Sequence, residues 1–200
     1  SATLAAAREL GLDIQGEPLF AIRPLPWDAP DPQRFDGLLL GSANAVRHFG
    51  PDRTAWAGKP AYVVGEATAE AAREAGFTVA MVGEGYLQGV VDCLAGPDRR
   101  LLRVTGVGHV RLNPPPGIEI ETCIAYENAA LPMPDMLAAR LRGGGVVLLH
   151  SAAAARHLAA ECDRLAIPRP GIALAALGPR IADAAGLGWN ACRIAAKPRE

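Results

Sequence analysis

The 200-residue sequence lacks the features that mark several broad classes of protein. It has no apolar run near the roughly 18 residues that a membrane-spanning helix needs. It also has no basic surplus, since 20 Lys and Arg residues face 21 Asp and Glu residues, whereas nucleic-acid-binding proteins are usually basic. The first ten residues include Arg8 and Glu9 and do not form a signal peptide. We therefore expect a cytoplasmic protein with neither a membrane nor a nucleic-acid partner.

Cysteine and lysine are scarce. No two of the four cysteines have the C-x-x-C spacing of a structural zinc site, so we expect no metal and four reduced thiols. Signatures such as H-E-x-x-H and G-x-S-x-G, which mark metalloproteases and hydrolases, are missing too. Lysine occurs only at Lys59 and Lys197, so arginine carries nearly all the positive charge. The planar guanidinium group suits carboxylates, and the unranked candidates to bind them are Arg23, Arg47, Arg103, Arg156 and Arg180.

Half of the residues are hydrophobic, and they form short apolar runs that alternate with alanine-rich segments. This alternation predicts an α/β fold with parallel sheets and helices on both faces. The predicted strands are 35–40, 61–64, 78–82, 101–105, 146–150, 172–177 and 191–195, with extended segments at 19–25 and 118–126. The predicted helices are 3–10, 43–49, 67–75, 87–94, 136–141, 152–160 and 180–185.

An internal repeat is the most informative feature of the sequence. The segment 39–48, LLGSANAVRH, resembles 148–157, LLHSAAAARH. Each is followed by a strand, a glycine and an alanine-rich helix, at 63–72 and again at 176–185. The repeat predicts two similar parallel-sheet α/β lobes. The extended segments 19–25 and 118–126 flank the first repeat and could pair as a two-stranded connector, leaving a cleft between the lobes.

Two serines occupy equivalent places in the repeat, because Ser42 and Ser151 each stand between a strand and a helix. A serine there can simply cap the helix. Alternatively, its hydroxyl and the neighbouring N–H groups can bind an anionic group. A second turn offers the same choice at Gly65 and Thr68, where glycine suits a tight turn. Its counterpart has Gly178 and Ile181, so a hydroxyl is missing there and Arg180 could donate instead.

Two further features carry alternatives of their own. The run 106–108, GVG, follows a strand, but Arg111 replaces the third glycine of a dinucleotide-binding loop and Pro114–Pro116 forbids a long helix. We therefore reject nucleotide binding by this loop. Tyr126 ends an extended segment, where a tyrosine can be a packing residue or can point its hydroxyl into a cleft as a donor or general acid. His48 and His157 occupy equivalent repeat positions and are expected to be half-exposed scaffold residues.

Taken together, the motifs resemble the uroporphyrinogen-III synthase family in the family's order along nearly the whole chain. They are GSANAV, VVGEATAEAA followed by AGF, GYLQGV, IAYE, LLHSAAA and ALGP. The resemblance implies two α/β lobes joined by a two-stranded ladder, with residues 1–23 and 128–200 in one lobe and 24–127 in the other. It implies an enzyme that closes linear hydroxymethylbilane into uroporphyrinogen III, inverting the last pyrrole ring and losing water, without metal or cofactor.

The resemblance also carries site residues to this sequence. It implies Tyr126 as the catalytic proton donor, and substrate binding by Ser42, Ala43, Gly65, Thr68 and Ser151, with Arg180 as a substitute donor. The substrate has eight carboxylates, which call for many N–H and hydroxyl donors. Catalysis would rest mainly on orientation, because direct closure without the enzyme gives the type I isomer. The expected partner is hydroxymethylbilane alone, bound by a monomer whose lobes close on it.

The sequence departs from the family in places. The opening strand with an Arg-Pro pair and the closing helix are not among the 200 residues, and Pro114–Pro116 replaces an expected helix. Two other functions remain to be weighed. One is a non-catalytic two-lobed sensor of a small anionic ligand, which would not need a donor at Tyr126. The other is a nucleotide-dependent transferase, which the missing phosphate-binding glycine motif disfavours.

Overall fold

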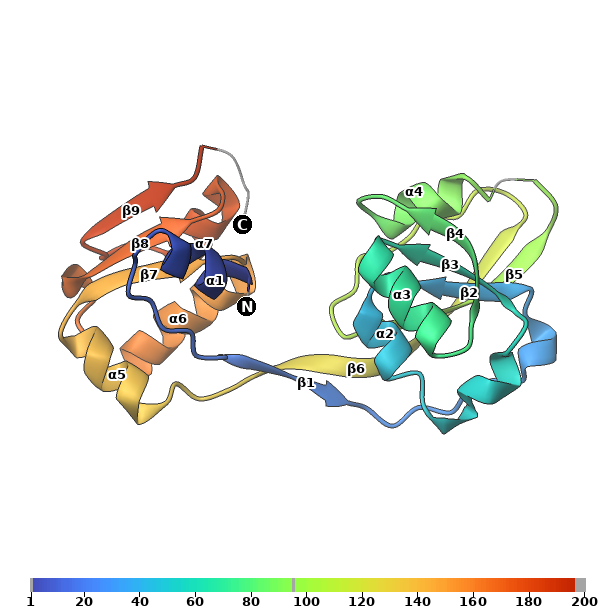
Figure 1. Cartoon of the computed structure of the whole chain (residues 1–200), viewed down its shortest axis with the longest axis horizontal. Coiled ribbons are helices and arrows are strands. Elements are labelled where there is room, and N and C mark those ends of the chain that lie inside the picture. The colour runs from blue at the N-terminus through green and yellow to red at the C-terminus, as the bar shows by residue number, and fades with distance from the viewer. Residues whose placement is uncertain (1, 95, 197–200) are drawn as a thin grey trace. The chain divides into compact units, whose positions relative to one another are not determined.

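The computed structural model describes residues 2–94 and 96–196 (Figure 1). Contacts between Cα atoms divide the chain into two compact units. Unit 1 comprises the chain up to Ala21 together with the chain from Ala130 onward, and unit 2 runs from Ile22 to Ala129. Each unit contains its own sheet and its own buried apolar core.

Unit 2 is built on five parallel strands. They are β2 (Gly37–Leu40), β3 (Pro60–Val64), β4 (Thr78–Gly83), β5 (Arg99–Gly106) and β6 (Ile118–Ala130). The sheet order is β1-β6-β5-β2-β3-β4, with β1 (Phe20–Pro24) at the edge beside β6. The chain therefore moves outward from β2 through β3 to β4 and then returns to the other side of β2. The direction of winding reverses between β2 and β5, and ligands favour such a point in parallel α/β sheets.

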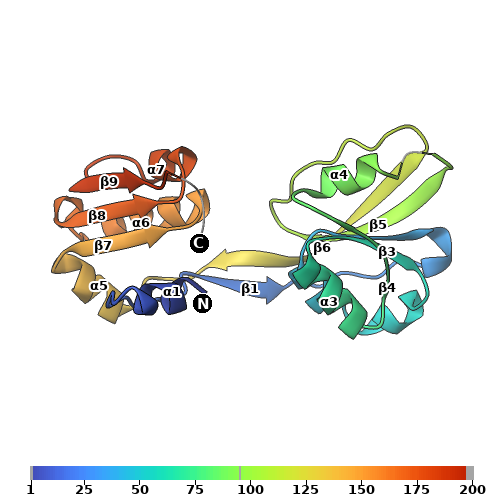
Figure 2. The same cartoon turned by 45° about the horizontal axis from the view of Figure 1, so that its top comes forward.

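Helices cover both faces of this sheet. On one face, α2 (Ala43–Arg47) and α3 (Glu66–Glu74) pack on a core that includes Phe35, Phe49 and Trp56. On the other face, α4 (Leu87–Asp92) packs on Leu39, Leu101 and Ile118. Figure 2 shows α3 and α4 on opposite sides of the strands. The alternation of side chains along β5 sends Leu102 and Val104 to the first face and Leu101 to the second.

Unit 1 has three parallel strands in the order β7-β8-β9. They are β7 (Gly145–Leu149), β8 (Ile172–Ala176) and β9 (Ala191–Ile194). The helices are α1 (Ala2–Glu9), α5 (Asp135–Arg142), α6 (Ala152–Arg164) and α7 (Pro179–Ala185). The apolar side chains of α5, α6 and α7 meet Leu149 and Leu174 of the sheet in one core. Within α6 these side chains recur every three or four residues, which is the spacing of one helix face.

The parallel α/β class predicted from the sequence is confirmed. The predicted strands and helices are all present, with ends that differ by a few residues. The largest differences are α6, which continues to Arg164, and β6, which continues to Ala130. Short 3-10 helices at Pro32–Arg34, Pro51–Trp56 and Arg169–Gly171 were not predicted. Within 2–94 and 96–196, no helix is both long enough and apolar enough to span a membrane.

Candidate functional site

The ends of β2 and β5 bring the main candidate residues of unit 2 together. Ser42 follows β2, and Gly106 ends β5. The direction of winding reverses between these two neighbouring strands. Tyr126 lies on β6 and is the register partner of Gly106. These residues therefore share the carboxyl edge of the parallel sheet, where loops and helix starts are open to a ligand.

Ser42 caps α2, as one of its two predicted roles requires. Its backbone is extended, and its Oγ accepts a hydrogen bond of 3.3 Å from the Ala45 N–H. The same Oγ lies 2.9 Å from the hydroxyl oxygen of Tyr126, and either atom can be the donor. Capping and contact with the candidate catalytic residue are thus both present at Ser42. Ala43, the next residue, is half-buried in the first turn of α2.

The position of the Tyr126 ring depends on Gly106. A Cβ at position 106 would come within 2.5 Å of this ring, and Gly106 has none. The ring can therefore lie across β5 and carry its hydroxyl to Ser42. A register shift between Thr105 and Gly106, and a 2.9 Å hydrogen bond from the Val107 N–H to the Tyr126 carbonyl, hold the two strands in this arrangement. Tyr126 is half-buried and packs against the core that contains Phe35, Phe49 and Trp56. Its ring therefore contributes to packing, while its hydroxyl contacts Ser42.

His48 completes the surroundings of Tyr126, a role that the sequence did not predict. The rings of His48 and Tyr126 lie 5.6 Å apart, centroid to centroid. His48 also lines a cavity of about 320 Å³ together with Arg47, Trp27 and the proline-rich segment 24–26. The indole N–H of Trp27 donates to the His48 carbonyl at 3.2 Å. The cavity thus shares His48 with the surroundings of Tyr126, and Arg47 is a cationic residue in its lining.

The second turn of unit 2 lies at the end of β3, the neighbour of β2. Gly65 begins α3 with φ +76° and ψ 148°, a conformation that only glycine adopts without strain. The prediction that this turn needs glycine is therefore confirmed. Gly65 is exposed, whereas Thr68 is only 5% exposed, so Thr68 offers a ligand much less surface than Gly65.

The remaining candidates, Ser151 and Arg180, belong to unit 1. Ser151 caps α6, with its Oγ accepting from the Ala154 N–H at 3.1 Å, and it is exposed. Arg180 is exposed on α7, directly after Gly178 and Pro179. Gly178 has φ −170°, which any residue adopts, so this turn differs from the one at Gly65. Within unit 1 the two candidates follow neighbouring strands, β7 and β8.

No metal-ligand cluster supports an alternative site. Across the described part of the chain, no three His, Cys, Asp or Glu side chains gather as the ligands of a metal ion would.

The comparisons with known proteins decide the family. The model of the family described as uroporphyrinogen-III synthase HemD matches residues 1–200. The chain belongs to the uroporphyrinogen-III synthase family.

A solved structure of a uroporphyrinogen-III synthase shares the fold. The uroporphyrinogen-III synthetase of Helicobacter pylori superposes with a TM-score of 0.64 at 18% identity, covering 90% of this chain and 85% of that one. A substituted uroporphyrinogen III synthase from the extremely thermophilic bacterium Thermus thermophilus gives a TM-score of 0.49 at 20% identity, covering 99% and 90% of the two chains. No curated protein matches the sequence.

Membership of the uroporphyrinogen-III synthase family confirms the function predicted from the motifs. The chain is an enzyme of tetrapyrrole biosynthesis with a small-molecule tetrapyrrole substrate, and the sensor alternative is not favoured. The roles of individual residues rest on the geometry of this chain.

Proposed function

We propose that Tyr126 donates the proton that releases the substrate's hydroxyl group as water, and that Ser42 orients it. The observation that carries this proposal is the 2.9 Å contact between the two hydroxyl oxygens at the carboxyl edge of the unit 2 sheet. A tyrosine hydroxyl that a polar side chain holds at this edge of the sheet has an orientation that suits a proton donor.

One arrangement of the hydroxyl protons suits the proposed role of Tyr126. Ser42 Oγ accepts from the Ala45 N–H, and either hydroxyl of the Ser42–Tyr126 pair can be the donor between them. When Ser42 donates to the Tyr126 oxygen, the phenolic proton of Tyr126 can point to a ligand. Such a chain of donors, from Ala45 through Ser42 to Tyr126, strengthens each bond in it.

The proposed step breaks the bond between the terminal carbon of hydroxymethylbilane and its hydroxyl oxygen. The electron pair of the bond leaves with the oxygen, and the proton from Tyr126 completes the water molecule. The electrons of the pyrrole nitrogen form the exocyclic double bond, and the N–H proton is lost, which leaves an azafulvene. The substituted α carbon of the last ring attacks the azafulvene carbon and forms a spiro-pyrrolenine. The bond from that α carbon to its original bridge then breaks, the freed bridge carbon bonds to the ring's other α carbon, and that carbon loses its proton, so the last ring is inverted.

Selectivity for this route is a matter of orientation, because direct closure gives the type I isomer. Several hydrogen-bond donors would share the task of holding the substrate's carboxylates. In unit 2 we assign this role to Ser42, Ala43, Gly65 and Thr68. In unit 1 we assign it to Ser151 and Arg180, which follow neighbouring strands.

The proposal also includes the domain organisation of the protein. It comprises lobes formed by residues 1–23 with 128–200 and by 24–127, a two-stranded connector, and a substrate cleft between the lobes. We also predict that the protein is a monomer, that it is located in the cytoplasm and that it has no nucleic-acid partner.

A coupled assay tests the function directly. Hydroxymethylbilane is generated in situ, the protein is added, and the products are oxidised and separated into type I and type III uroporphyrin. An excess of type III over the protein-free control is the expected result. Type I alone, from protein shown to be folded and to span its full natural length, would overturn the assignment.

The Tyr126→Phe variant tests the residue. It keeps the ring over Gly106 and removes only the hydroxyl, so the fold should persist while type III turnover drops about ten-fold or more. Tyr86→Phe is the matched control, because Tyr86 is 84% exposed and lies outside the proposed site. Equal turnover in the two variants would remove Tyr126 from the mechanism.

A further inference from the structure

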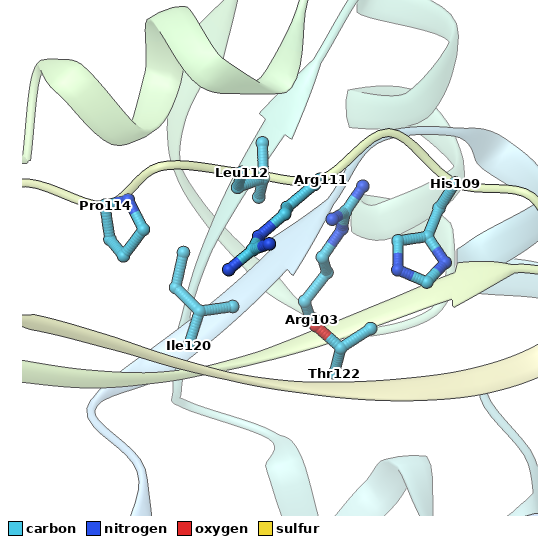
Figure 3. Close-up of a pocket in the computed structure, with 7 residues that line it drawn as sticks. All are labelled: Arg103, His109, Arg111, Leu112, Pro114, Ile120 and Thr122. Atoms are coloured by element: carbon cyan, nitrogen blue, oxygen red, sulfur yellow. The ribbon is translucent and has the colours of Figure 1, made fainter.

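A second cavity lies on the opposite face of the unit 2 sheet, the face covered by α4. Its volume is about 140 Å³, and it is lined by Arg103, His109, Arg111, Leu112, Pro114, Ile120 and Thr122 (Figure 3). A cavity of this volume can admit a small carboxylate group, and it is too small for a whole tetrapyrrole.

The cavity exists because no helix connects β5 to β6. Parallel neighbours are usually joined by a crossover helix that covers the sheet face. Here the connection, residues 107–117, contains the run Pro114–Pro116 and is irregular. It crosses the sheet face as an extended loop, and the space that a helix would fill stays partly open beneath it (Figure 3).

The loop is fixed at two points. The side-chain amide of Gln88, on α4, donates to the Asn113 carbonyl and accepts from the Asn113 N–H, both at 2.9 Å. Arg103 Nη1 donates to the Val110 carbonyl at 2.8 Å. Hydrogen bonds thus hold the walls of the cavity in place. Binding a ligand there costs less conformational entropy, because the loop is already ordered.

Arg103 is the unusual residue of this cavity. It lies in the middle of β5, only 6% of it is exposed, and its Nε is buried without a hydrogen-bond partner. Burial lowers the pKa of the Arg103 guanidinium from its ordinary value, and the nearby Tyr126 partly opposes this change. A buried cation with an unsatisfied N–H is costly unless an anion accompanies it.

Acidic residues do not accompany it. None of the seven lining residues is Asp or Glu, and within the described residues neither Arg103 nor Arg111 forms an ion pair. The nearby Glu121 alternates to the other face of β6, where it pairs with Arg34 and Arg100. Two guanidinium groups and the His109 ring therefore line one cavity with no carboxylate of the protein.

From this arrangement we infer that the cavity under loop 107–117 is a carboxylate-binding site. The guanidinium groups of Arg103 and Arg111 donate to the carboxylate, and Thr122 lines the same cavity. The carboxylate can belong to an acetate or propionate side chain of the tetrapyrrole or to a small free acid. Only the first source rests on the proposed function.

Acetate is the probe that tests the site without any assay of activity. The full chain, labelled with nitrogen-15, is titrated with sodium acetate at constant ionic strength, with sodium chloride as the balancing salt. We expect saturable shifts of the backbone amide signals of Arg103, Arg111 and Thr122, with a dissociation constant in the millimolar range. Their absence would overturn the proposal, whatever the protein's activity.

Arg111→Gln is the main variant, because Arg111 is exposed and its loss leaves the Arg103–Val110 hydrogen bond intact. It should weaken acetate binding about ten-fold, the usual effect of losing a hydrogen bond from a charged donor. Arg53→Gln makes the same charge change on an exposed residue far along the chain from the loop and should change binding less than two-fold. Arg103→Lys keeps the charge and should also weaken binding. Equal weakening of acetate binding by Arg111→Gln and Arg53→Gln would show that the net charge of the protein attracts acetate without a specific site. That result would overturn the proposal.

The kinetic constants of the Arg111→Gln variant show whether the carboxylate belongs to the substrate or to a free acid. If a substrate side chain enters the cavity, Arg111→Gln raises KM for hydroxymethylbilane about ten-fold with little change in kcat. If a free acid is the occupant, KM stays unchanged while acetate still binds, which supports the site with the other source. If no type III product forms at all but the acetate shifts appear, the proposed function fails and the carboxylate site stands.

Discussion

The two units use the same strand–serine–helix turn, yet only one of the turns holds a second functional group. Ser42 and Ser151 are both extended, and each accepts a hydrogen bond from the N–H three residues ahead, at 3.3 and 3.1 Å. In unit 2, Ser42 Oγ also meets the Tyr126 hydroxyl. In unit 1, Ser151 is exposed, and among residues 2–94 and 96–196 its side chain hydrogen-bonds only the Ala154 N–H. Both turns thus share the cap, and in unit 2 the serine also contacts the proposed proton donor.

The second turns of the units diverge further. Gly65 requires a positive φ, whereas Gly178 is extended and is followed by Pro179, which starts α7 with its φ already fixed. Glycine at equivalent positions of the repeat therefore has two different structural roles. Tyr126 and Gly106 lie outside the repeated motifs, whereas Ser42, their partner in the candidate site, lies within one. The sequence repeat therefore accounts for the strand–serine–helix turns and for only part of the site.

The largest expected effect comes from the glycine that makes room for Tyr126. Gly106→Ala places a Cβ within 2.5 Å of the ring, so the ring must move and its hydroxyl leaves Ser42. A displacement of this size in a proton donor can cost about 10²-fold in turnover. Rates of type III formation measure it. Val107, 59% exposed on the adjoining loop, gives the control variant Val107→Ala, which should keep near-normal turnover; equal losses in the two would separate Tyr126 from catalysis.

The fold was largely predictable because its signals are local. Short apolar runs bounded by glycine, such as 37–40 and 145–149, predict parallel strands; the first is fully buried, whereas Val146 and Leu148 of the second are exposed. The capping serines could be identified from their position before a helix. The short 3-10 helices were missed, since a proline followed by polar residues is equally typical of a loop.

The site was only partly predictable because its contacts join distant residues. Ser42 and Tyr126 are 84 positions apart, and their meeting depends on β5 lying between β2 and β6. Gly106 was weighed only as part of a phosphate-binding loop, whereas its role follows from register with Tyr126. Arg103 had a local signal, since a charge inside the apolar run 101–104 points to a buried cation, but its cavity depends on the loop above it.

The glycine comparison between the units predicts the next effect, on stability. Gly65→Ala forces alanine into φ +76° and ψ 148° and should cost about 1–3 kcal/mol of unfolding free energy. Gly178→Ala should be nearly neutral, because φ is −170° and a Cβ there meets no atom within 4 Å. Urea unfolding of both variants measures the difference. Similar costs at the two positions would mean that the turns are equivalent after all.

Unit 1 has a buried polar anchor at Glu161 on α6. Glu161 is 7% exposed, accepts the Met133 N–H at 2.6 Å and holds Arg164 through two bonds of 2.7 Å. The Arg164 hydrogen bonds, followed by the Met133 bond, lower the pKa of Glu161 from 4.5 to about 2.

Because this pKa is lower in the folded state, Glu161 stabilises unit 1 fully above about pH 4.5 and loses that effect as pH falls toward 2. Glu161→Ala, which strands the buried Met133 N–H, should cost about 1–3 kcal/mol at pH 7 and less at pH 3. Hydrogen exchange of the β7 and β8 amides reports on unit 1 alone. A cost that does not change with pH would place the stabilisation elsewhere than in the ionised carboxylate.

The smallest expected effect separates the two serine caps. Ser42→Ala and Ser151→Ala each remove one cap and should each lower the unfolding free energy by about 1 kcal/mol. Their effects on turnover should differ, because only Ser42 holds the Tyr126 hydroxyl. We expect Ser42→Ala to reduce type III formation several-fold more than Ser151→Ala, and Ser42→Thr, which restores a hydroxyl, to recover part of the loss. Thermal unfolding and the coupled assay, run on the same preparations, separate the shared capping role from the role that unit 2 acquired. If the two alanine variants match in both measurements, the contact with Tyr126 has no catalytic weight and the units are alike in function as well as in backbone.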